Sequence, residues 1–263
     1  MLTQRTPWQI TRSVWYALYM RELLARVINN RFAWFWMVFE PLAFIAIMVA
    51  VRVVVFGREK VLINADFIPW LIVGLLSFFL FREQMIRLMG AVTANKALYA
   101  YRQVKPVDTV FVRSGLEGLL KTFVFSLFIV FGLLLAIPMW PQDWWVVLYA
   151  WLSLWALGFG IGLTLSVLAT MVEEVGIIFR MLTLPLLLIS GVIIPLTYLP
   201  HHLVEYLLYN PIVHGIETIR LGFYPDYHTV QGITMQYLWY WALSTTALGL
   251  ILHLRFEAKL KTK

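Results

Sequence analysis

Long uncharged apolar runs dominate the second half of the chain and recur, less cleanly, in the first half. Four runs contain 21, 29, 24 and 28 residues and cover 122–142, 144–172, 181–204 and 227–254. About 20 apolar residues cross the hydrocarbon core of a bilayer as a helix, so each run can hold one membrane span. Two further apolar segments, 33–56 and 67–81, are interrupted by Glu40 and Arg52 or are shorter.

These runs predict an all-α integral membrane protein with six transmembrane helices. We expect the helices at about 33–56, 68–88, 114–137, 145–171, 177–195 and 235–254. Before them, residues 8–28 carry apolar side chains on one helical face and charges on the other, although Trp8, Trp15 and Tyr19 fall on the polar side, where aromatic rings suit the headgroup boundary. That pattern is typical of an amphipathic helix lying at the membrane surface. The chain therefore divides into an N-terminal interfacial helix, 1–32, and a six-span domain, 33–263.

Basic residues orient this topology. With a cytoplasmic N-terminus, 16 of the 21 Lys and Arg side chains fall in cytoplasmic segments. Three fall outside, at Arg58, Lys60 and Arg220, and two lie within spans, at Arg52 and Lys121. This asymmetry satisfies the positive-inside rule. We predict a multi-pass protein with both termini in the cytoplasm, which agrees with an even number of spans.

Composition narrows the function classes. Hydrophobic residues make up 61% of the chain and charged residues 13%, against about 45–50% and about 25% in ordinary soluble domains. A soluble enzyme is excluded, and the net charge of +7 is explained by cytoplasmic loops rather than by nucleic acid.

Signatures of enzymes and metal sites are missing from the sequence. There is no cysteine, no Walker A motif, no H-E-x-x-H and no G-x-S-x-G, and the external histidines match no metal-site spacing. We expect no catalysis, metal or cofactor in this chain.

The cytoplasmic loop 90–113 combines small residues with tyrosines and cations. Its candidate binding residues are Lys96, Tyr99, Tyr101, Arg102 and Lys105. Pro106 should end one helix, and Asp108 or Thr109 can cap the next. Two interpretations stay open: a solvated positive loop, or a short helix that docks a cytoplasmic partner through its aromatic anchors.

Charges within the spans need partners or a polar environment. Glu117 and Lys121 have the i, i+4 spacing of an intrahelical pair. Glu40 and Arg52 lie about 18 Å apart along one helix and cannot pair, so each should face a protein interior, a water-filled path or the interface. In the fourth span Gly158, Gly160 and Gly162 predict close helix packing.

The external segment 196–227 is rich in proline yet too apolar for a solvated loop. Irregular backbone at membrane depth is tolerated only against protein or a water-filled path, so we expect re-entrant helices that form a gate or a pore mouth. The alternative is an interfacial aromatic belt. Asn210-Pro211 should separate two short helices, and Glu217 and Arg220 should pair at i, i+3. The gate residues are Asn210, Pro211, His214, Glu217 and Arg220.

Two motifs carry a resemblance to a known family. They are the loop Tyr101-Arg102-Gln103-Val104-Lys105-Pro106 and the closing stretch Ser190-Gly191…Pro195…Leu199-Pro200…Tyr209-Asn210-Pro211…His214-Gly215…Glu217…Arg220. Together with the arginine-rich first helix, they resemble the membrane subunits of ABC-type polysaccharide exporters, and most of all the permeases that export bacterial capsular polysaccharide.

The resemblance implies a set of partners in the bacterial inner membrane. The permease would be a homodimer among membrane lipids, each copy docked to a separate ATP-binding cassette ATPase that binds ATP and Mg. The cargo would be a polysaccharide or lipid-linked polysaccharide, handed to periplasmic export partners. The loop between spans two and three would be the coupling helix, with residues 94–105 in a groove of the ATPase.

The same resemblance implies a translocation path at the dimer interface, lined mainly by spans one and five. Aromatic rings suit such a path because they give a sliding sugar chain many weak, similar contacts, whereas plain lipid contact is the alternative. Candidate path residues are Arg31, Trp34, Trp36, Phe39, Glu40, Phe44 and Arg52.

Other cargoes and one other class of protein stay open at this point. A permease of the same architecture could carry O-antigen, teichoic acid or a drug, and a non-transporting scaffold could recruit a partner through residues 94–105. Charges at membrane depth argue against the scaffold.

Overall fold

The computed structural model describes residues 6–28, 32–56, 61–62 and 65–262. Apart from one two-residue hairpin, its regular structure is helical, in agreement with the all-α prediction. The α-helices are α1 (Pro7–Ile28), α2 (Ala33–Phe56), α3 (Phe67–Met89), α4 (Ala91–Ala94), α5 (Pro106–Leu134), α6 (Trp144–Met171), α7 (Glu173–Leu188), α8 (His201–Leu207), α9 (Pro211–Phe223) and α10 (Met235–Thr262). Short 3-10 helices are η1 (Lys96–Ala100) and η2 (Leu196–Tyr198), and β1 (Val61–Leu62) pairs antiparallel with β2 (Ala65–Asp66).

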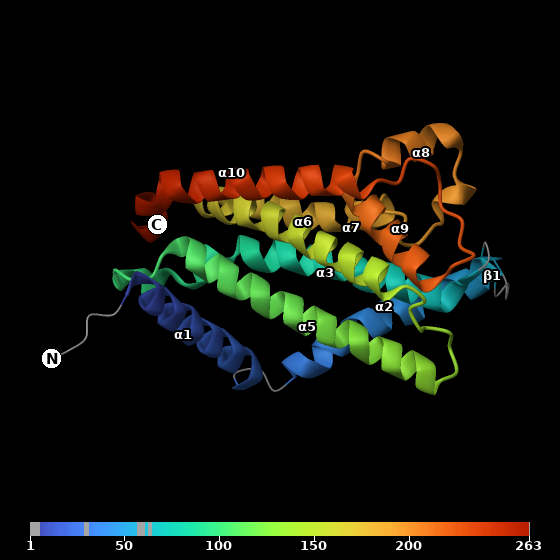
Figure 1. Cartoon of the computed structure of the whole chain (residues 1–263), viewed down its shortest axis with the longest axis horizontal. Coiled ribbons are helices and arrows are strands. Elements are labelled where there is room, and N and C mark those ends of the chain that lie inside the picture. The colour runs from blue at the N-terminus through green and yellow to red at the C-terminus, as the bar shows by residue number, and fades with distance from the viewer. Residues whose placement is uncertain (1–5, 29–31, 57–60, 63–64, 263) are drawn as a thin grey trace.

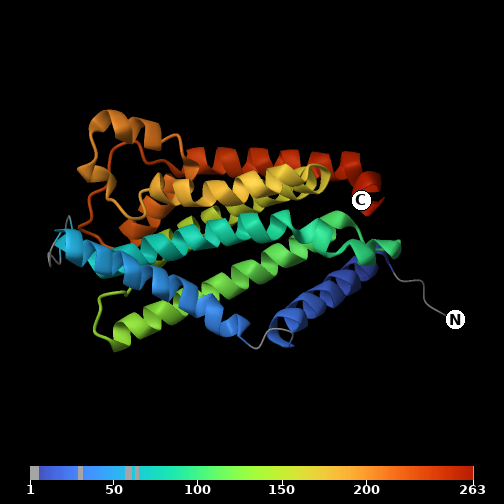
Figure 2. The ribbon, with the colours of Figure 1, turned by 180° about the vertical axis from the view of Figure 1, so that it is seen from behind.

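The long helices lie side by side in an elongated bundle (Figure 1). The beginning of α1, the loop after α3 and the end of α10 are gathered at one end of it. The opposite end carries α8, α9 and the small hairpin, as the reverse view also shows (Figure 2). We call these two ends of the bundle the loop end (residues 90–106 and their neighbours) and the α8–α9 end.

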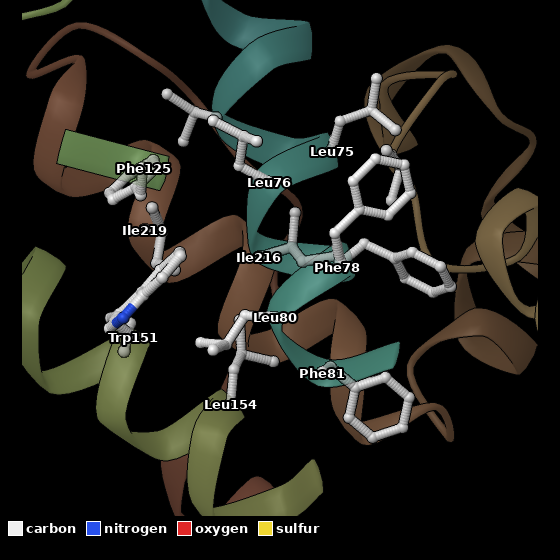
Figure 3. Close-up of a cluster of buried hydrophobic side chains, with 14 of the residues drawn as sticks. Leu75, Leu76, Phe78, Leu80, Phe81, Phe125, Trp151, Leu154, Ile216 and Ile219 are labelled. Atoms are coloured by element: carbon white, nitrogen blue, oxygen red, sulfur yellow. The ribbon is translucent and has the colours of Figure 1, made fainter. Parts of the chain in front are cut away.

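The central helix is α3, whose side chains are buried along nearly its whole length. Leu75 and Leu80 of α3 lie in one apolar cluster with Leu154 of α6 and Ile216 of α9 (Figure 3). An apolar helix can be covered by protein or by lipid, and α3 is covered by protein, with α6 and α9 among its neighbours.

Glycines of α6 allow the close packing that the sequence predicts. A Cβ at Gly158 would lie 2.7 Å from the Gln84 Cβ atom, and one at Gly162 would lie 2.8 Å from the Leu88 Cβ atom. Gly160 faces the opposite way, against the backbone of α10 at Ala242. The three glycines thus bring α6 against α3 on one side and α10 on the other.

Three predicted boundaries need correction. The helix expected from 114 begins at Pro106, which occupies the first turn, where a missing N–H costs nothing. The helix expected to reach 195 ends at Leu188, before a turn in which Gly191 has a φ of +66°. The last helix runs on to Thr262.

In the described ranges, α5 and α6 are the two helices that by length and apolarity could each cross a membrane, and Phe35–Val51 is a shorter apolar stretch.

Candidate functional site

The loop end is an ordered structure and not a solvated linker. Between α3 and α5, the buried Asn95 side chain donates to the Ala91 carbonyl at 2.8 Å. The Tyr99 hydroxyl lies 3.1 Å from both the Val92 carbonyl and the Thr109 hydroxyl. Burial raises the pKa of Tyr99, so this phenol stays protonated. These bonds hold α4 and η1 in one orientation.

The five loop residues predicted to bind a partner divide into two groups. Tyr99 is buried and its hydroxyl is hydrogen-bonded within the loop, so it stabilises the loop, and its part in coupling stays a prediction. The side chain of Tyr101 is 67% exposed, and the three cations Lys96, Arg102 and Lys105 are exposed beside it. The surface left for a partner is thus one tyrosine among three positive charges.

Helix α1 is joined directly to this loop. The Trp15 indole N–H donates to Asp108 Oδ1 at 2.9 Å, while Asp108 Oδ2 accepts from the Lys105 backbone N–H at 3.1 Å. Arg21 also donates to the Asn95 side-chain oxygen. The sequence indicated a membrane-surface helix only, and its attachment to the loop depends on contacts that no local pattern reveals.

Further from the loop, buried charges connect α1 to α3 and α5. Glu117 of α5 is buried and pairs with Arg26 of α1, and Arg87 of α3 lies 3.8 Å away. The expected partner, Lys121, forms no ion pair with Glu117 among the described residues. The described partners of Glu117 therefore come from other helices.

A second group of charges links α2 to α3. Arg82 donates to Glu40 of α2 and, at 2.7 Å, to its neighbour Glu83. Glu83 also accepts from Arg87 at 3.2 Å. Glu40, predicted to face an interior or a path, is therefore paired while its side chain stays 49% exposed. The i, i+4 spacing of Glu83 and Arg87 is the one sequence signal that could have indicated this cluster.

Two predicted path residues, Trp36 and Phe39, lie near Glu40 in the first half of α2, together with their neighbour Phe35. Phe35, Trp36 and Phe39 are exposed, with ring centroids 4.9–5.7 Å apart: Phe35 stacks on Phe39, and Trp36 meets both rings edge-on. Phe44 instead packs edge-on against Phe79 of α3 at 6.0 Å. Three further predicted path residues lie outside the described residues or side chains: Arg31, Trp34 and Arg52.

At the α8–α9 end, the predicted pairing of Glu217 with Arg220 is confirmed. Their oxygen and nitrogen atoms are 2.6 Å apart, and both side chains are 0% exposed. The Arg220 guanidinium donates to the carbonyls of Gly191 at 2.8 Å and Val192 at 3.0 Å. It also lies 3.5 Å from the centroid of the Trp70 ring of α3, in a cation–π contact.

The Glu217 carboxylate has further partners in the same centre. Its second carboxylate oxygen accepts from the Tyr227 hydroxyl at 2.9 Å and the Thr229 hydroxyl at 2.6 Å. A Cβ at Gly74 of α3 would collide with the Arg220 guanidinium, so glycine makes room for it. Sequence reasoning found the pair but missed Trp70, Gly74, Tyr227 and Thr229, which come from distant parts of the chain.

The predicted break at Asn210-Pro211 is also confirmed, because α8 ends at Leu207 and α9 begins at Pro211. Asn210 caps α9 by accepting from the Ile212 N–H at 3.1 Å, and its amide donates to the Ser190 hydroxyl at 2.9 Å.

His214, the third predicted gate residue of this segment, is buried and bonded at both ring nitrogens. Its Nδ1 accepts from the Thr234 N–H at 3.1 Å, so its Nε2 donates to the Leu208 carbonyl at 2.9 Å. A gate role for these buried residues stays a prediction. In the described part of the chain no three acidic or histidine side chains gather as metal ligands.

Comparison with known proteins identifies the class. The model of the ABC-2 type transporter family matches residues 13–224. The polysialic acid transport protein KpsM of Escherichia coli is 30% identical over 98% of this chain and 99% of its own length. The capsule polysaccharide export inner-membrane protein CtrC of Neisseria meningitidis is 29% identical over 92% of this chain and 89% of its own.

A third relative agrees. The capsule polysaccharide export inner-membrane protein BexB of Haemophilus influenzae is 29% identical over 80% of this chain and 78% of its own. The chain therefore belongs to the ABC-2 type transporter family, and is an all-α integral membrane protein.

Proposed function

We propose that this chain is the transmembrane subunit of an ABC exporter that moves capsular polysaccharide across the bacterial inner membrane. The observation that carries the proposal is 30% identity with a polysialic acid transport protein over 98% of the chain. Two further relatives are named for capsule polysaccharide export. The chain itself hydrolyses nothing, and a separate ATPase binds ATP and Mg.

The proposed topology has six spans, formed by α2, α3, α5, α6, α7 and α10. Helix α1 would be the interfacial helix of the N-terminal segment 1–32, and α8 and α9 would be re-entrant helices. The loop end would be cytoplasmic together with both termini. Its support is the grouping of the loop, the start of α1 and the end of α10 at one end of the bundle, opposite α8 and α9 (Figure 1). The cations concentrate at the proposed cytoplasmic end, as the positive-inside rule requires.

The loop between α3 and α5, residues 90–105 of the predicted coupling segment 90–113, would couple the ATPase to the membrane domain. Tyr101 and the three exposed cations form a surface that suits a groove with acidic and apolar walls, since buried aromatic and arginine side chains dominate protein interfaces. Hydrogen bonds tie this loop to α1 and α5. A displacement of the loop on ATP binding would therefore move both helices with it.

Two copies would enclose the path between them. The aromatic cluster Phe35, Trp36 and Phe39 exposes ring faces on α2, and α7 exposes a row of large apolar side chains. A polysaccharide would slide past such rings because each contact is weak and similar to the next. At the other end, α8 and α9 would close the path toward the periplasmic export partners.

Deletion of the gene, followed by location of the polymer, tests this function. We expect capsular polymer to accumulate in the cytoplasm and to return to the surface when the wild-type chain is supplied. Accumulation of O-antigen or teichoic acid would show that the chain belongs to an exporter with a different cargo. Normal surface polymers of every kind would contradict the exporter itself.

Single cysteines in this cysteine-free chain test the topology. An impermeant thiol reagent added to intact cells should label cysteine at Gln142 and His228 but not at Lys96 or Thr262. Labelling at Lys96 would contradict the proposed orientation.

A further inference from the structure

Helix α1 turns a charged and aromatic face toward the first half of α5, beside which it lies (Figure 1). Three contacts follow in the same order along both helices: Trp15 stacks on Phe111 with ring centroids 5.9 Å apart, Glu22 pairs with Arg113 at 2.6 Å, and Arg26 pairs with Glu117. Because the residue numbers rise together on both helices, α1 and α5 run parallel. Positions 15, 22 and 26 share one face of α1, so this face is covered by protein.

The opposite face of α1 is exposed, and its chemistry changes along the helix. The first part of this face is polar, because Gln9 and Ser13 are exposed there. The second part is largely apolar: Tyr16 is 64% exposed, Ala17 is exposed and Leu24 is 51% exposed. The face that no described residue covers is therefore suited to water at its beginning and to hydrocarbon at its end.

The charges of α1 follow the same division. Arg12, in the first half, is exposed, and Arg21 is exposed but donates to the Asn95 side chain in the loop. After it, the side chains of Glu22 and Arg26 are only 15% and 24% exposed, and each is paired with α5. Charges at membrane depth need such partners. The described second half of α1 thus meets the requirement for burial in lipid.

The pair of Arg26 with Glu117 places the end of α1 beside an apolar stretch of α5. Glu117 follows Pro106, the first residue of α5, by 11 residues, about 16 Å along the axis. From residue 119 on, the large exposed side chains of α5 are apolar, beginning with Leu119 and Phe123. Helix α5 also has the length and apolarity to cross a membrane. The end of α1 is therefore at the depth where α5 begins to face hydrocarbon.

We propose that α1 enters the membrane at an angle instead of lying flat on its surface. Its first half stays among the lipid headgroups, and its second half lies against the acyl chains of one leaflet, the cytoplasmic one in the proposed topology. The partner of the exposed face around Tyr16, Ala17 and Leu24 is thus lipid. A flat interfacial helix turns its polar face to water, whereas the second half of α1 turns its charges to α5.

Spin labels on single cysteines in the cysteine-free chain test the tilt. The labels replace Ser13, Ala17 and Leu24, which are exposed on the same face, in the chain inserted into vesicles of phosphatidylethanolamine and phosphatidylglycerol. Depth is measured from collisions with oxygen, which concentrates in hydrocarbon, and with a water-soluble nickel chelate. Labels at Gln103 and Phe123, both exposed, give the references for water and hydrocarbon.

We expect depth to increase from position 13 through 17 to 24. The last label should lie at least about 5 Å deeper than the first, out of about 16 Å of helix axis between them. Equal depths would mean a flat helix and overturn the proposal. Free access of the nickel chelate to all three labels would overturn it as well, as would protection from both reagents, which would show that protein covers this face.

A charge variant tests whether pairing permits this position. Glu117→Gln leaves Arg26 with Glu22 at 3.8 Å, and Glu22 is already held by Arg113. Because an underpaired cation is drawn toward the headgroups, we expect the label at 24 to become shallower while the label at 13 keeps its depth. The neutral double variant Arg26→Gln with Glu117→Gln should restore the original depth. A shift in both variants, or in neither, would overturn the role given to the pair.

These depths need neither the ATPase nor a polymer, so they separate the inference from the proposed function. If depth increases along α1 and no polymer depends on the gene, the tilt stands and the exporter fails. If export requires the gene and the three depths are equal, the tilt fails alone.

Discussion

The two charged centres of this molecule lie at opposite ends and are built differently. At the α8–α9 end, Glu217 and Arg220 are completely buried, and described partners surround the guanidinium and the carboxylate. At the loop end, Arg82 is shared between a buried and a half-exposed carboxylate. The first centre joins α9 to α3 and two loops, and the second joins α2 to α3.

The difference shows how burial decides what an ion pair can do. Breaking a fully buried pair leaves a desolvated charge and costs about 3–5 kcal/mol, so the Glu217–Arg220 centre holds its helices in fixed positions. An exposed pair is worth about 0.2–1 kcal/mol, so the half-exposed Glu40 contact contributes much less to the stability of the fold. Four predictions test this contrast, from the largest expected effect to the smallest.

Arg220→Ala should have the largest effect. It leaves Glu217 buried without its cation, and we expect a loss of about 3–5 kcal/mol, seen as a lower unfolding temperature and reduced insertion of the chain. The double variant Glu217→Gln with Arg220→Met should recover much of this loss, because no charge stays buried. If Arg220→Ala unfolded at the wild-type temperature, the centre would not hold the α8–α9 end together.

Gly74→Ala should destabilise the same centre without removing a charge. The new Cβ collides with the Arg220 guanidinium, which its partners hold in place, so we expect a loss of about 1–3 kcal/mol in thermal unfolding. Gly115→Ala on α5 is the control, since nothing lies within 4 Å of its Cβ position. There alanine should stabilise the helix by about 0.5–1 kcal/mol. Equal effects at both glycines would contradict the tight fit around Arg220.

Tyr101→Ala should leave the fold intact and weaken binding of the ATPase. The side chain is 67% exposed, so unfolding should not change, while the loss of an interface anchor of roughly 2 kcal/mol reduces ATPase affinity about 30-fold. Tyr99→Phe is the contrasting variant: it removes a buried hydroxyl and should lower stability by about 1 kcal/mol. Co-purification of the ATPase and thermal unfolding are measured on both variants. Loss of ATPase binding in Tyr99→Phe but not in Tyr101→Ala would contradict this assignment of roles.

Glu40→Gln should have the smallest effect on stability, less than about 1 kcal/mol, and yet a clear one on transport. We expect unchanged insertion and unfolding together with an altered rate of polymer export. Glu173→Gln is the control, an exposed carboxylate at the start of α7 with no ion pair among the described residues. A loss of stability in Glu40→Gln comparable to that of Arg220→Ala would remove the distinction between the two centres.

The sequence alone determined the features that depend on composition or on neighbours within one or two helical turns. Run lengths and the distribution of basic residues predicted an all-α membrane protein. The proline after Asn210 predicted the break between α8 and α9, and the i, i+3 spacing predicted the pair of Glu217 with Arg220. Each of these follows from chain geometry that holds before any helix meets another.

Only the tertiary structure decided which helix supplies the partner of each charge. Glu117 pairs with Arg26, 91 residues away, and not with Lys121 on its own helix. Tyr99 turns inward while Tyr101 stays exposed, although both are tyrosines of one loop. The physical reason is that the apolar pattern of a helix specifies which face is covered but not which neighbour covers it. That choice depends on packing shape, such as the space that Gly74 leaves for Arg220.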